Sequence, residues 1–304
     1  MERRDKSMIT LLQLDYFRKL AATEHITKTA KELYISQTAL SSMIIGLEKE
    51  LGTPLFDRSN RAIHLNEAGK TYLKYVNEVF RSLENGKSAL ADLGDAHEKD
   101  ICLAMGTSQV WVPMLRSFHS AFPQYRIKQS GMSRTGLYNS LRDLQVDFVL
   151  AGMDDIALDG FAYEEIKDDG IYLCVSENHR FANRDSVYLE EIHDEKFINL
   201  SDESPWGEYC NRLFEQAGYK INPSIICDYT LRSALIETGM GVALTTGLAR
   251  DIDLLKPNKY IRIADKNATR KMAIIWNPQK YMSKASECFK DFCITYIKEN
   301  QKPA

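Results

Sequence analysis

Four short polar side chains near the N-terminus have the spacing of one face of a helix. They stand at relative positions i, i+1, i+4 and i+5, as Gln37, Thr38, Ser41 and Ser42. A glutamine can form two hydrogen bonds with adenine, and hydroxyl groups can serve several bases, so such a face can meet base edges in DNA. An ordinary solvated helix surface is the alternative, and the helix taken alone favours it. The neighbouring elements must decide between these two interpretations.

The apolar spacing predicts three short helices around this face. One buried stripe runs through Leu11, Leu14, Phe17, Leu20 and Ala21. A second helix is expected over residues 27–33, followed by a three-residue turn. Ser36 is a good N-cap for a third helix, Gln37–Leu51. Two helices joined by so short a turn predict a helix-turn-helix.

Two short strands are predicted to follow the third helix. Residues 55–58 and 61–65 flank a polar Ser59-Asn60 turn. Arg58 and Arg61 would lie on this hairpin, where guanidinium groups can meet phosphate or the minor groove. The sequence therefore predicts a winged helix-turn-helix over residues 8–69, preceded by a mobile extension at residues 1–7.

The charge of the chain is distributed unevenly. The net charge is −3, but residues 1–66 carry ten Lys or Arg and eight Asp or Glu, a net charge of +2. A slightly basic head on an acidic body fits a protein that binds DNA at one end only. The difference is small, so the motif carries more weight than the charge.

A long helix with a heptad seam is predicted next, within residues 67–93. Its spacing of 4-3-4-3 runs through Tyr72, Val76, Val79, Leu83, Gly86, Leu90 and Leu93. Such a seam is typical of a coiled coil. The alternative is that the stripe packs on its own domain. A hinge to the second domain is expected at residues 97–100.

From Ile101 onward, short apolar runs alternate with helical stretches. The runs cover residues 101–105, 125–129, 147–151, 171–175, 197–200, 224–227 and 242–244. The helices are expected at residues 111–121, 135–144, 207–217, 230–238 and 282–299. This alternation predicts open, mainly parallel α/β sheets.

Small polar groups follow several of these strands or precede the next helix. They include Thr107, Ser108, Ser133, Gly152, Ser204, Trp206, Tyr229 and Thr245. Ligands of open α/β sheets bind beyond the carboxyl ends of the strands, near helix N-termini. Each hydroxyl could simply cap its helix. Together they predict one cleft for a small molecule.

Three larger side chains hint at the ligand. Arg134 and Arg232 could anchor a carboxylate, although arginines are more often surface residues. Trp206 could stack on a ring-bearing ligand, although packing at a helix start is the commoner role. These residues leave the identity of the effector open.

No catalytic or metal motif is found. Residues 131–136 read G-x-S-x-x-G, which misses the spacing of a nucleophile elbow, and no histidine or carboxylate partner can be assigned. Phosphate-binding and dinucleotide-binding motifs and metal-ligand spacings are lacking too. We therefore expect no enzyme, no cofactor and no metal. The six cysteines are expected to be buried free thiols, with a Cys210–Cys227 redox switch as the alternative.

The sequence also predicts where the protein works. No apolar run approaches the roughly 18 residues needed to cross a bilayer. The charged N-terminus lacks the apolar core of a signal peptide. We therefore expect a cytoplasmic protein without a membrane partner.

Residues 11–69 closely resemble the LysR-type transcriptional regulators. The matching residues are Leu14, Phe17, Ala30, Leu33, Ser36, Gln37, Ala39, Leu40, Ser41, Ile44, Leu47, Glu48, Leu51, Gly52, Leu55, Phe56, Arg58, Arg61, Leu65 and Gly69. In that family the positions of Gln37, Thr38, Ser41, Ser42, Arg58 and Arg61 lie at the DNA. This chain departs from the family at Thr38, where proline is usual, and at Ser42 and Ile45, which are often basic. Fewer cationic contacts predict weaker salt-dependent binding.

The resemblance continues more loosely through residue 265 and implies the rest of the architecture. It implies an α+β multidomain protein with a linker helix over residues 70–96, through which two chains dimerise by Tyr72, Val76, Val79, Leu83 and Leu90. The effector domain, residues 97–304, would have two α/β lobes like those of periplasmic binding proteins. Lobe I would cover residues 101–167 and 267–304, and lobe II residues 168–266.

The implied partners are promoter DNA, a small-molecule effector, RNA polymerase and a second copy of the chain, as a homodimer or homotetramer. Two other classes remain as alternatives: a solute-binding protein, and an enzyme on the same α/β scaffold. A solute-binding protein would need export and would not need the first ninety residues.

Overall fold

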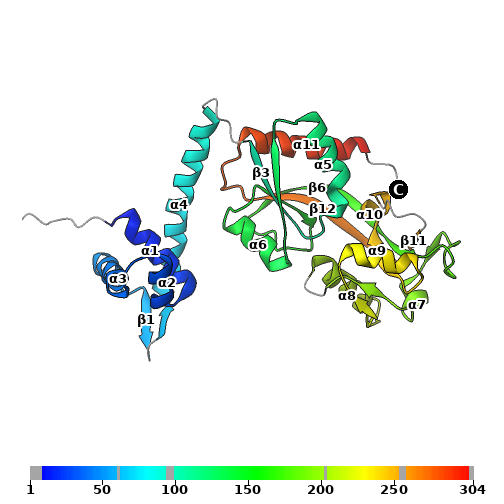
Figure 1. Cartoon of the computed structure of the whole chain (residues 1–304), viewed down its shortest axis with the longest axis horizontal. Coiled ribbons are helices and arrows are strands. Elements are labelled where there is room, and N and C mark those ends of the chain that lie inside the picture. Colours follow the sequence, from blue (N-terminus) through cyan, green and yellow to red (C-terminus); the bar gives the residue numbers. More distant parts are fainter. Residues whose placement is uncertain (1–8, 60–61, 94–98, 202–203, 253–257, 301–304) are drawn as a thin grey trace, which may run out of the picture. The chain divides into compact units, whose positions relative to one another are not determined.

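The computed structural model describes residues 9–59, 62–93, 99–201, 204–252 and 258–300. The chain divides into two compact units, Met1–Lys87 and Ser88–Ala304 (Figure 1). The predicted extension at residues 1–7 and hinge residues 97 and 98 lie outside the described residues. Within the described ranges, no helix combines the length and apolarity needed to cross a membrane.

The first unit is built on three helices around one core. These are α1 (Leu11–Thr23), α2 (Ile26–Glu32) and α3 (Gln37–Leu51). Leu40, Ile44 and Leu47 of α3 pack against Phe17 of α1. The Ser36 hydroxyl accepts a hydrogen bond from the Ala39 N–H at 3.1 Å, so α3 begins at the predicted cap. The predicted helix-turn-helix is confirmed.

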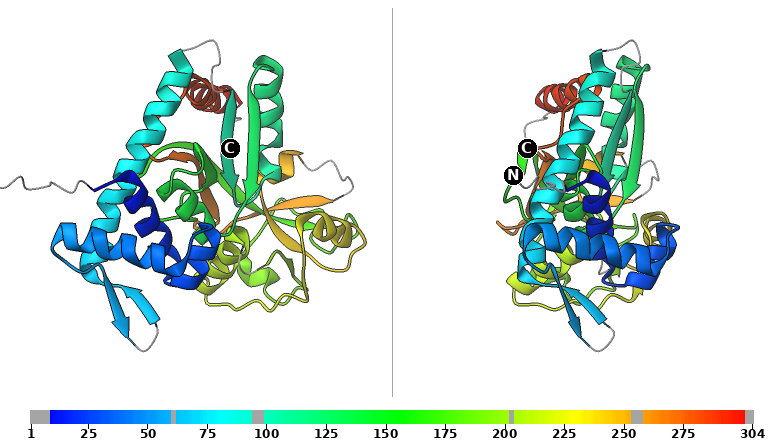
Figure 2. Two further views of the ribbon diagram at one scale, coloured as in Figure 1. Left: turned by 60° about the vertical axis from the view of Figure 1, so that its left-hand side comes forward. Right: turned by 90° about the vertical axis from the view of Figure 1, so that its left-hand side faces the viewer.

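The carboxylates of two glutamates tie the wing to these helices. The wing consists of two antiparallel strands, β1 (Phe56–Ser59) and β2 (Ala62–Leu65). Glu48 of α3 accepts hydrogen bonds from the N–H groups of Leu55 and Phe56, at 2.8 and 3.2 Å. Glu24, which ends α1, accepts one from the Leu65 N–H at 2.8 Å. Both strands are therefore anchored at their helix-proximal ends, and Figure 2 shows them projecting beyond the helices.

The long helix α4 (Glu67–Leu93) has two different halves. Val76 is 1% exposed and packs in the core of the first unit, where the Tyr72 ring lies 5.7 Å from that of Phe17. The prediction that Val76 faces a second chain is therefore wrong, because this side chain belongs to the core of its own domain. Further along, Leu83 and Leu90 are exposed, at 42% and 71%.

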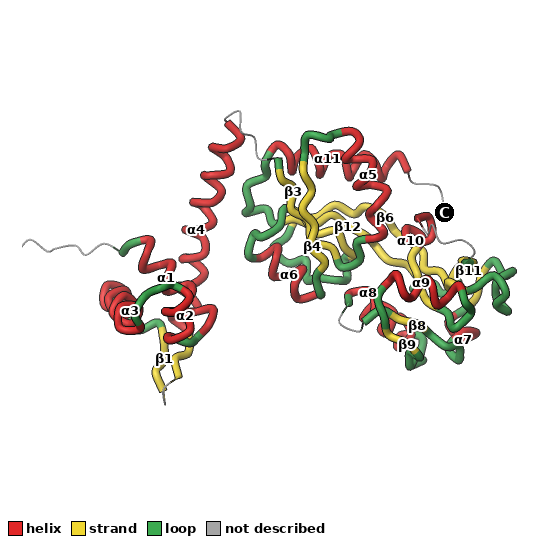
Figure 3. The backbone as a smooth tube through the Cα atoms, in the orientation of Figure 1, coloured by secondary structure: helices red, strands yellow, loops and turns green. Residues whose placement is uncertain are grey.

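One sheet organises the second unit, with strand order β4-β3-β5-β12-β6-β11-β7. Lobe I contains β3 (Asp100–Met105), β4 (Arg126–Gly131), β5 (Phe148–Gly152), η1 (Gln109–Trp111), α5 (Val112–Ala121), α6 (Arg134–Arg142) and α11 (Lys284–Asn300). Residues alternate along β3: Leu103 packs with α5 and α11 on one face, and Ala104 packs with α6 on the other. Figure 3 shows these strands between the helices of lobe I.

Lobe II has shorter strands. It contains β7 (Ser186–Val187), α7 (Leu189–Ile192), β8 (Ile198–Asn199), α8 (Pro205–Gln216), β9 (Ile225–Ile226), α9 (Tyr229–Glu237), β10 (Ala243–Thr246), α10 (Gly247–Ile252) and β11 (Lys259–Ile263). Its main core joins the far half of β6 to α8, through contacts that include Leu173 and Phe214. Ile236 of α9 packs in a second cluster with Cys174 and Ala243.

Two long strands run from one lobe into the other. They are β6 (Ala162–Val175) and β12 (Thr269–Trp276), which pair antiparallel. The far half of β6 also pairs antiparallel with β10 and β11. The prediction of mainly parallel sheets is therefore wrong around β6, because apolar runs report burial but not strand direction. Strands, rather than loops, carry the chain between the lobes.

Two glycines of α4 should respond in opposite ways to the same substitution. A Cβ on Gly69 would lie 2.1 Å from the Leu55 carbonyl oxygen, whereas a Cβ on Gly86 would meet nothing within 4 Å. Gly69→Ala should lower the thermal unfolding midpoint because the backbone at Leu55 must move. Gly86→Ala should stabilise the helix by roughly 0.5–1 kcal/mol. Circular dichroism melts of both variants test this, and equal shifts would contradict it.

Candidate functional site

The predicted DNA-facing residues of α3 lie on its outer surface. Gln37, Thr38 and Ser42 are exposed, and Ser41 is half-buried. The opposite face of the helix carries the buried leucines of the core. Arg58 lies on β1, and Arg61 lies outside the described residues. The exposed side chains of Gln37, Thr38 and Ser42 can meet a groove. The contact of all six predicted residues with DNA stays a prediction.

A cavity lies between the two lobes of the second unit. Its space amounts to about 410 Å³, including the part open to solvent. Of the eight predicted effector residues, four line it: Thr107, Trp206, Tyr229 and Thr245. Thr107 comes from the loop after β3, and the other three come from lobe II. The structure therefore brings half of the predicted residues to one place.

The other four predicted residues do not line this cavity. Ser133 caps α6 by accepting the Gly136 N–H, and Ser204 caps α8 by accepting the Gly207 N–H at 3.0 Å. These two serines follow the capping alternative. Gly152 is buried beside Arg270, and Ser108 precedes η1 without a capping hydrogen bond from its side chain.

Several lining residues were not predicted. Trp111, Asp155 and Arg270 all face the cavity, and no local pattern distinguishes them. Arg232 was expected to be a surface residue more often than an anchor, yet it is only 4% exposed. Arg232 lies on α9 one turn after Tyr229, so the helical spacing places both on the cavity side.

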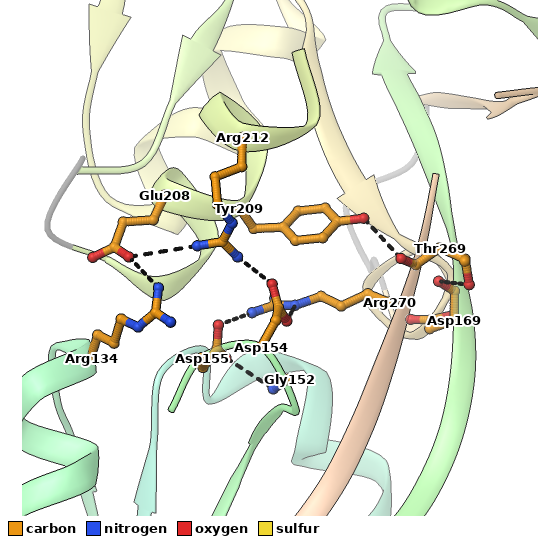
Figure 4. Close-up of polar contacts among 10 residues, drawn as sticks. All are labelled: Arg134, Gly152, Asp154, Asp155, Asp169, Glu208, Tyr209, Arg212, Thr269 and Arg270. Carbon is orange, nitrogen blue, oxygen red and sulfur yellow. Dashed lines mark hydrogen bonds and ion pairs between the residues drawn. The ribbon is translucent and has the colours of Figure 1, made fainter. Parts of the chain in front are cut away.

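An ion-pair network crosses between the lobes beside the cavity (Figure 4). Arg270 of β12 is only 4% exposed and contacts the carboxylates of Asp155 and Asp154. Asp155 also accepts the Gly152 N–H at 2.9 Å. This cluster lies directly at the carboxyl end of β5, beside Gly152.

The network continues into lobe II. Arg212 contacts Asp154 and lies 3.8 Å from Glu208, and Glu208 pairs with Arg134 of lobe I at 2.9 Å. Three guanidinium groups thus face three carboxylates, so the network is electrically balanced. Its outer members are partly exposed, and exposed ion pairs stabilise a fold weakly. The loss of one partner of the buried pair between Arg270 and Asp155 would cost more, because the other charge would stay buried without its counter-ion.

Aromatic rings complete the wall next to Arg270. Its guanidinium lies 5.4 Å from the centre of the Trp206 ring and 5.0 Å from that of Tyr209. The two rings stack at 5.3 Å. The Tyr209 hydroxyl donates to the Thr269 carbonyl at 3.0 Å, and burial raises the pKa of this phenol. Trp206 is therefore packed by lobe II and still lines the cavity.

The two cysteines of the redox alternative are both free thiols. Burial raises the pKa of Cys210 to about 12, and it also raises the pKa of Cys227. Oxidation proceeds through the thiolate, which is scarce at such pKa values. These environments give no support to a redox switch. Across the described residues, no group of three or more His, Cys, Asp or Glu side chains is placed to hold a metal ion.

A winged helix-turn-helix joined to a two-lobed α/β unit with a cavity defines a DNA-binding regulator with a ligand-binding domain. Residues 98–298 match the family described as the LysR substrate binding domain. Residues 11–70 match the bacterial regulatory helix-turn-helix proteins of the lysR family. The chain belongs to the LysR family of transcriptional regulators, as its sequence predicts.

Similar proteins share this organisation along nearly the whole chain. An uncharacterized HTH-type transcriptional regulator, YybE, of Bacillus subtilis is 29% identical over 295 residues, which cover 94% of this chain and 99% of that one. A probable RuBisCO transcriptional regulator of Phaeodactylum tricornutum is also 29% identical, over 92% and 94%.

Solved structures share the fold. Full-length OxyR from Pseudomonas aeruginosa, in a variant form, has a TM-score of 0.65 at 19% identity and covers 94% of this chain and 98% of its own. CbnR complexed with its target DNA has a TM-score of 0.54 at 18% identity, over 96% and 99%.

Removing one partner of the buried pair should destabilise the second unit strongly. Asp155→Ala leaves the Arg270 guanidinium with less compensation in a buried place, which should cost about 3 kcal/mol. Asp143 offers a matched control, because its pair with Arg142 is about half exposed, at 42% and 55%. Asp143→Ala should cost less than about 1 kcal/mol. Urea unfolding of both variants gives the comparison, and similar losses would refute the ranking.

Proposed function

We propose that this regulator binds a small-molecule effector in the cavity between its lobes and operator DNA through α3 and the wing. The observation that carries the proposal is the cavity itself, which is walled by both lobes and lined by buried polar groups. Trp111 of lobe I and Arg232 of lobe II both contribute to it. A molecule held there touches both lobes, so it favours one arrangement of them over another by its differential contacts.

The proposal assigns no catalytic role to the chain. Ser133, the candidate closest to a nucleophile motif, is engaged as the cap of α6. Action on chromosomal DNA would place the protein in the cytoplasm, where RNA polymerase would be a further partner. The effector would change transcription through the geometry of the bound DNA.

The proposed base reading by α3 predicts a loss of sequence preference in Gln37→Ala. A good bidentate contact between a side chain and a base is worth about 1–3 kcal/mol of discrimination. Binding to a specific operator from the DNA flanking the gene should weaken accordingly, while binding to random DNA stays unchanged. Gln124 is exposed in the second unit, so Gln124→Ala is a matched control. Gel-shift titrations measure both affinities, and a proportional loss on all DNA would count against base reading.

The exposed half of α4 is proposed as a self-association surface. Val79 and Leu83 are 41% and 42% exposed, although both are apolar and share one seam. Leu83→Glu should weaken self-association by roughly tenfold or more, because a buried leucine side chain is worth about 1.5–3 kcal/mol. Lys87→Glu, on the same helix, controls for the change of charge. Sedimentation velocity reports the assembly, and an unchanged dissociation constant for Leu83→Glu would exclude this surface.

A further inference from the structure

Arg232 carries a buried positive charge that no carboxylate of the described residues compensates. Its side chain lies over the Tyr229 ring, 4.9 Å from the centre, and Nη1 donates to the Leu244 carbonyl at a long 3.4 Å. Its Nε–H has no hydrogen-bond partner within the described part of the chain. A buried charge without a counter-ion is costly. A negatively charged group bound beside Arg232 would therefore lower the free energy of the folded protein.

The nearby carboxylates do not meet this demand because they are already engaged. Asp155 lines the same cavity, but it contacts Arg270 and the Gly152 N–H. Asp154 and Glu208 are likewise paired within the balanced network. With Asp155 and Arg270 cancelling, Arg232 leaves a single positive charge on the cavity wall.

The remaining unsatisfied groups of the cavity are also donors. The indole N–H groups of Trp111 and Trp206 are buried and have no acceptor among the described residues. Both rings line the cavity. Buried polar groups normally find a partner, so orphan donors gathered in one cavity indicate a missing acceptor. An oxyanion offers several lone pairs to such donors.

The rest of the wall is apolar. Val110, Leu150, Leu200 and Met272 line the cavity beside the polar groups. A bare inorganic ion would leave these side chains against water, whereas a short hydrocarbon body would cover them. The lining therefore favours an organic molecule with a short apolar part over a bare ion.

We propose that the effector is a small organic monoanion whose carboxylate pairs with Arg232, with Trp111 and Trp206 as further donors. The inference rests on the proposed function, because it names the ligand class of the same cavity. Arg232 and Trp206 belong to lobe II, and Trp111 belongs to lobe I. One carboxylate thus receives hydrogen bonds from both lobes, so the ligand favours one arrangement of the lobes over another.

The cost of the uncompensated charge of Arg232 can be tested in the absence of ligand. Arg232→Met replaces the guanidinium by an apolar side chain of similar length. Without any carboxylate in the buffer, its thermal midpoint should equal or exceed that of the wild type, because an uncompensated buried charge is removed. A midpoint lowered as far as that of Asp155→Ala would show that Arg232 is structurally paired, and would overturn the proposal.

A ligand series tests the chemical class. Carboxylates from acetate to hexanoate are titrated into the full chain beside the corresponding neutral amides and inorganic sulfate. Trp111 and Trp206 are two of the three tryptophans, so fluorescence reports on the cavity directly. The best carboxylate should bind about tenfold tighter than its amide, since a charge-assisted hydrogen bond is lost. Arg232→Met should abolish this difference, and Arg232→Lys should keep part of it.

A matched variant controls for the general loss of a positive charge. Arg126 pairs with Asp100 and is 71% exposed, so Arg126→Met should leave the carboxylate preference unchanged. Sulfate binding as tightly as the best carboxylate would overturn the organic class. An absence of response to every carboxylate would overturn the proposal altogether.

The outcomes separate this inference from the proposed function. If wild type and Arg232→Met both bound acid and amide equally, the effector would not be recognised as an anion. The proposed function, a regulator that responds to a ligand, would still stand. Carboxylate binding that never alters the DNA footprint would support the anion site and count against the proposed function.

Discussion

Arg270 is buried where two strands pass between the lobes, and a buried guanidinium needs carboxylates around it. The residues near Arg270 are arranged to provide them. Arg270 pairs in register with Asp169 of β6, and its side chain reaches Asp155 at the end of β5. Gly152 has to be a glycine for this approach, because a Cβ there would lie 2.4 Å from the Arg270 Nε. Cavity wall, strand end and interlobe network therefore depend on one buried charge.

Arg270 and Arg232 are almost equally buried, at 4% exposure each, yet their surroundings differ. Carboxylates surround Arg270, so its charge contributes to a fixed geometry. Arg232 faces an aromatic ring and one carbonyl, so its charge raises the free energy of the ligand-free state. The anion proposed above would remove that cost on binding. The same residue type is thus structural in one position and suited to a ligand in the other.

The local features could be predicted from sequence, and the long-range ones could not. Helix α3 follows from the Ser36 cap and the apolar stripe of Leu40, Ile44 and Leu47, which all lie within residues 36–47. The pairing of Asp155 with Arg270 joins residues 115 positions apart, and no periodicity encodes it. Likewise, the heptad pattern of α4 predicts that Val76 is buried. It does not predict whether Val76 is buried in the core of its own domain or against another chain.

The cavity also has a continuous set of packed contacts leading away from it. Trp111 ends η1 and leads into α5, whose Phe118 ring lies 4.9 Å from that of Phe289 in α11. At the start of α11, the Lys284 N–H donates to the buried carboxylate of Asp92 at 3.0 Å, in the last turn of α4. Because α4 is the covalent continuation of the DNA-binding unit, a ligand signal that uses this route must shift α11 between two arrangements. An effector that left α11 in place would bind without changing the DNA-binding unit through this route.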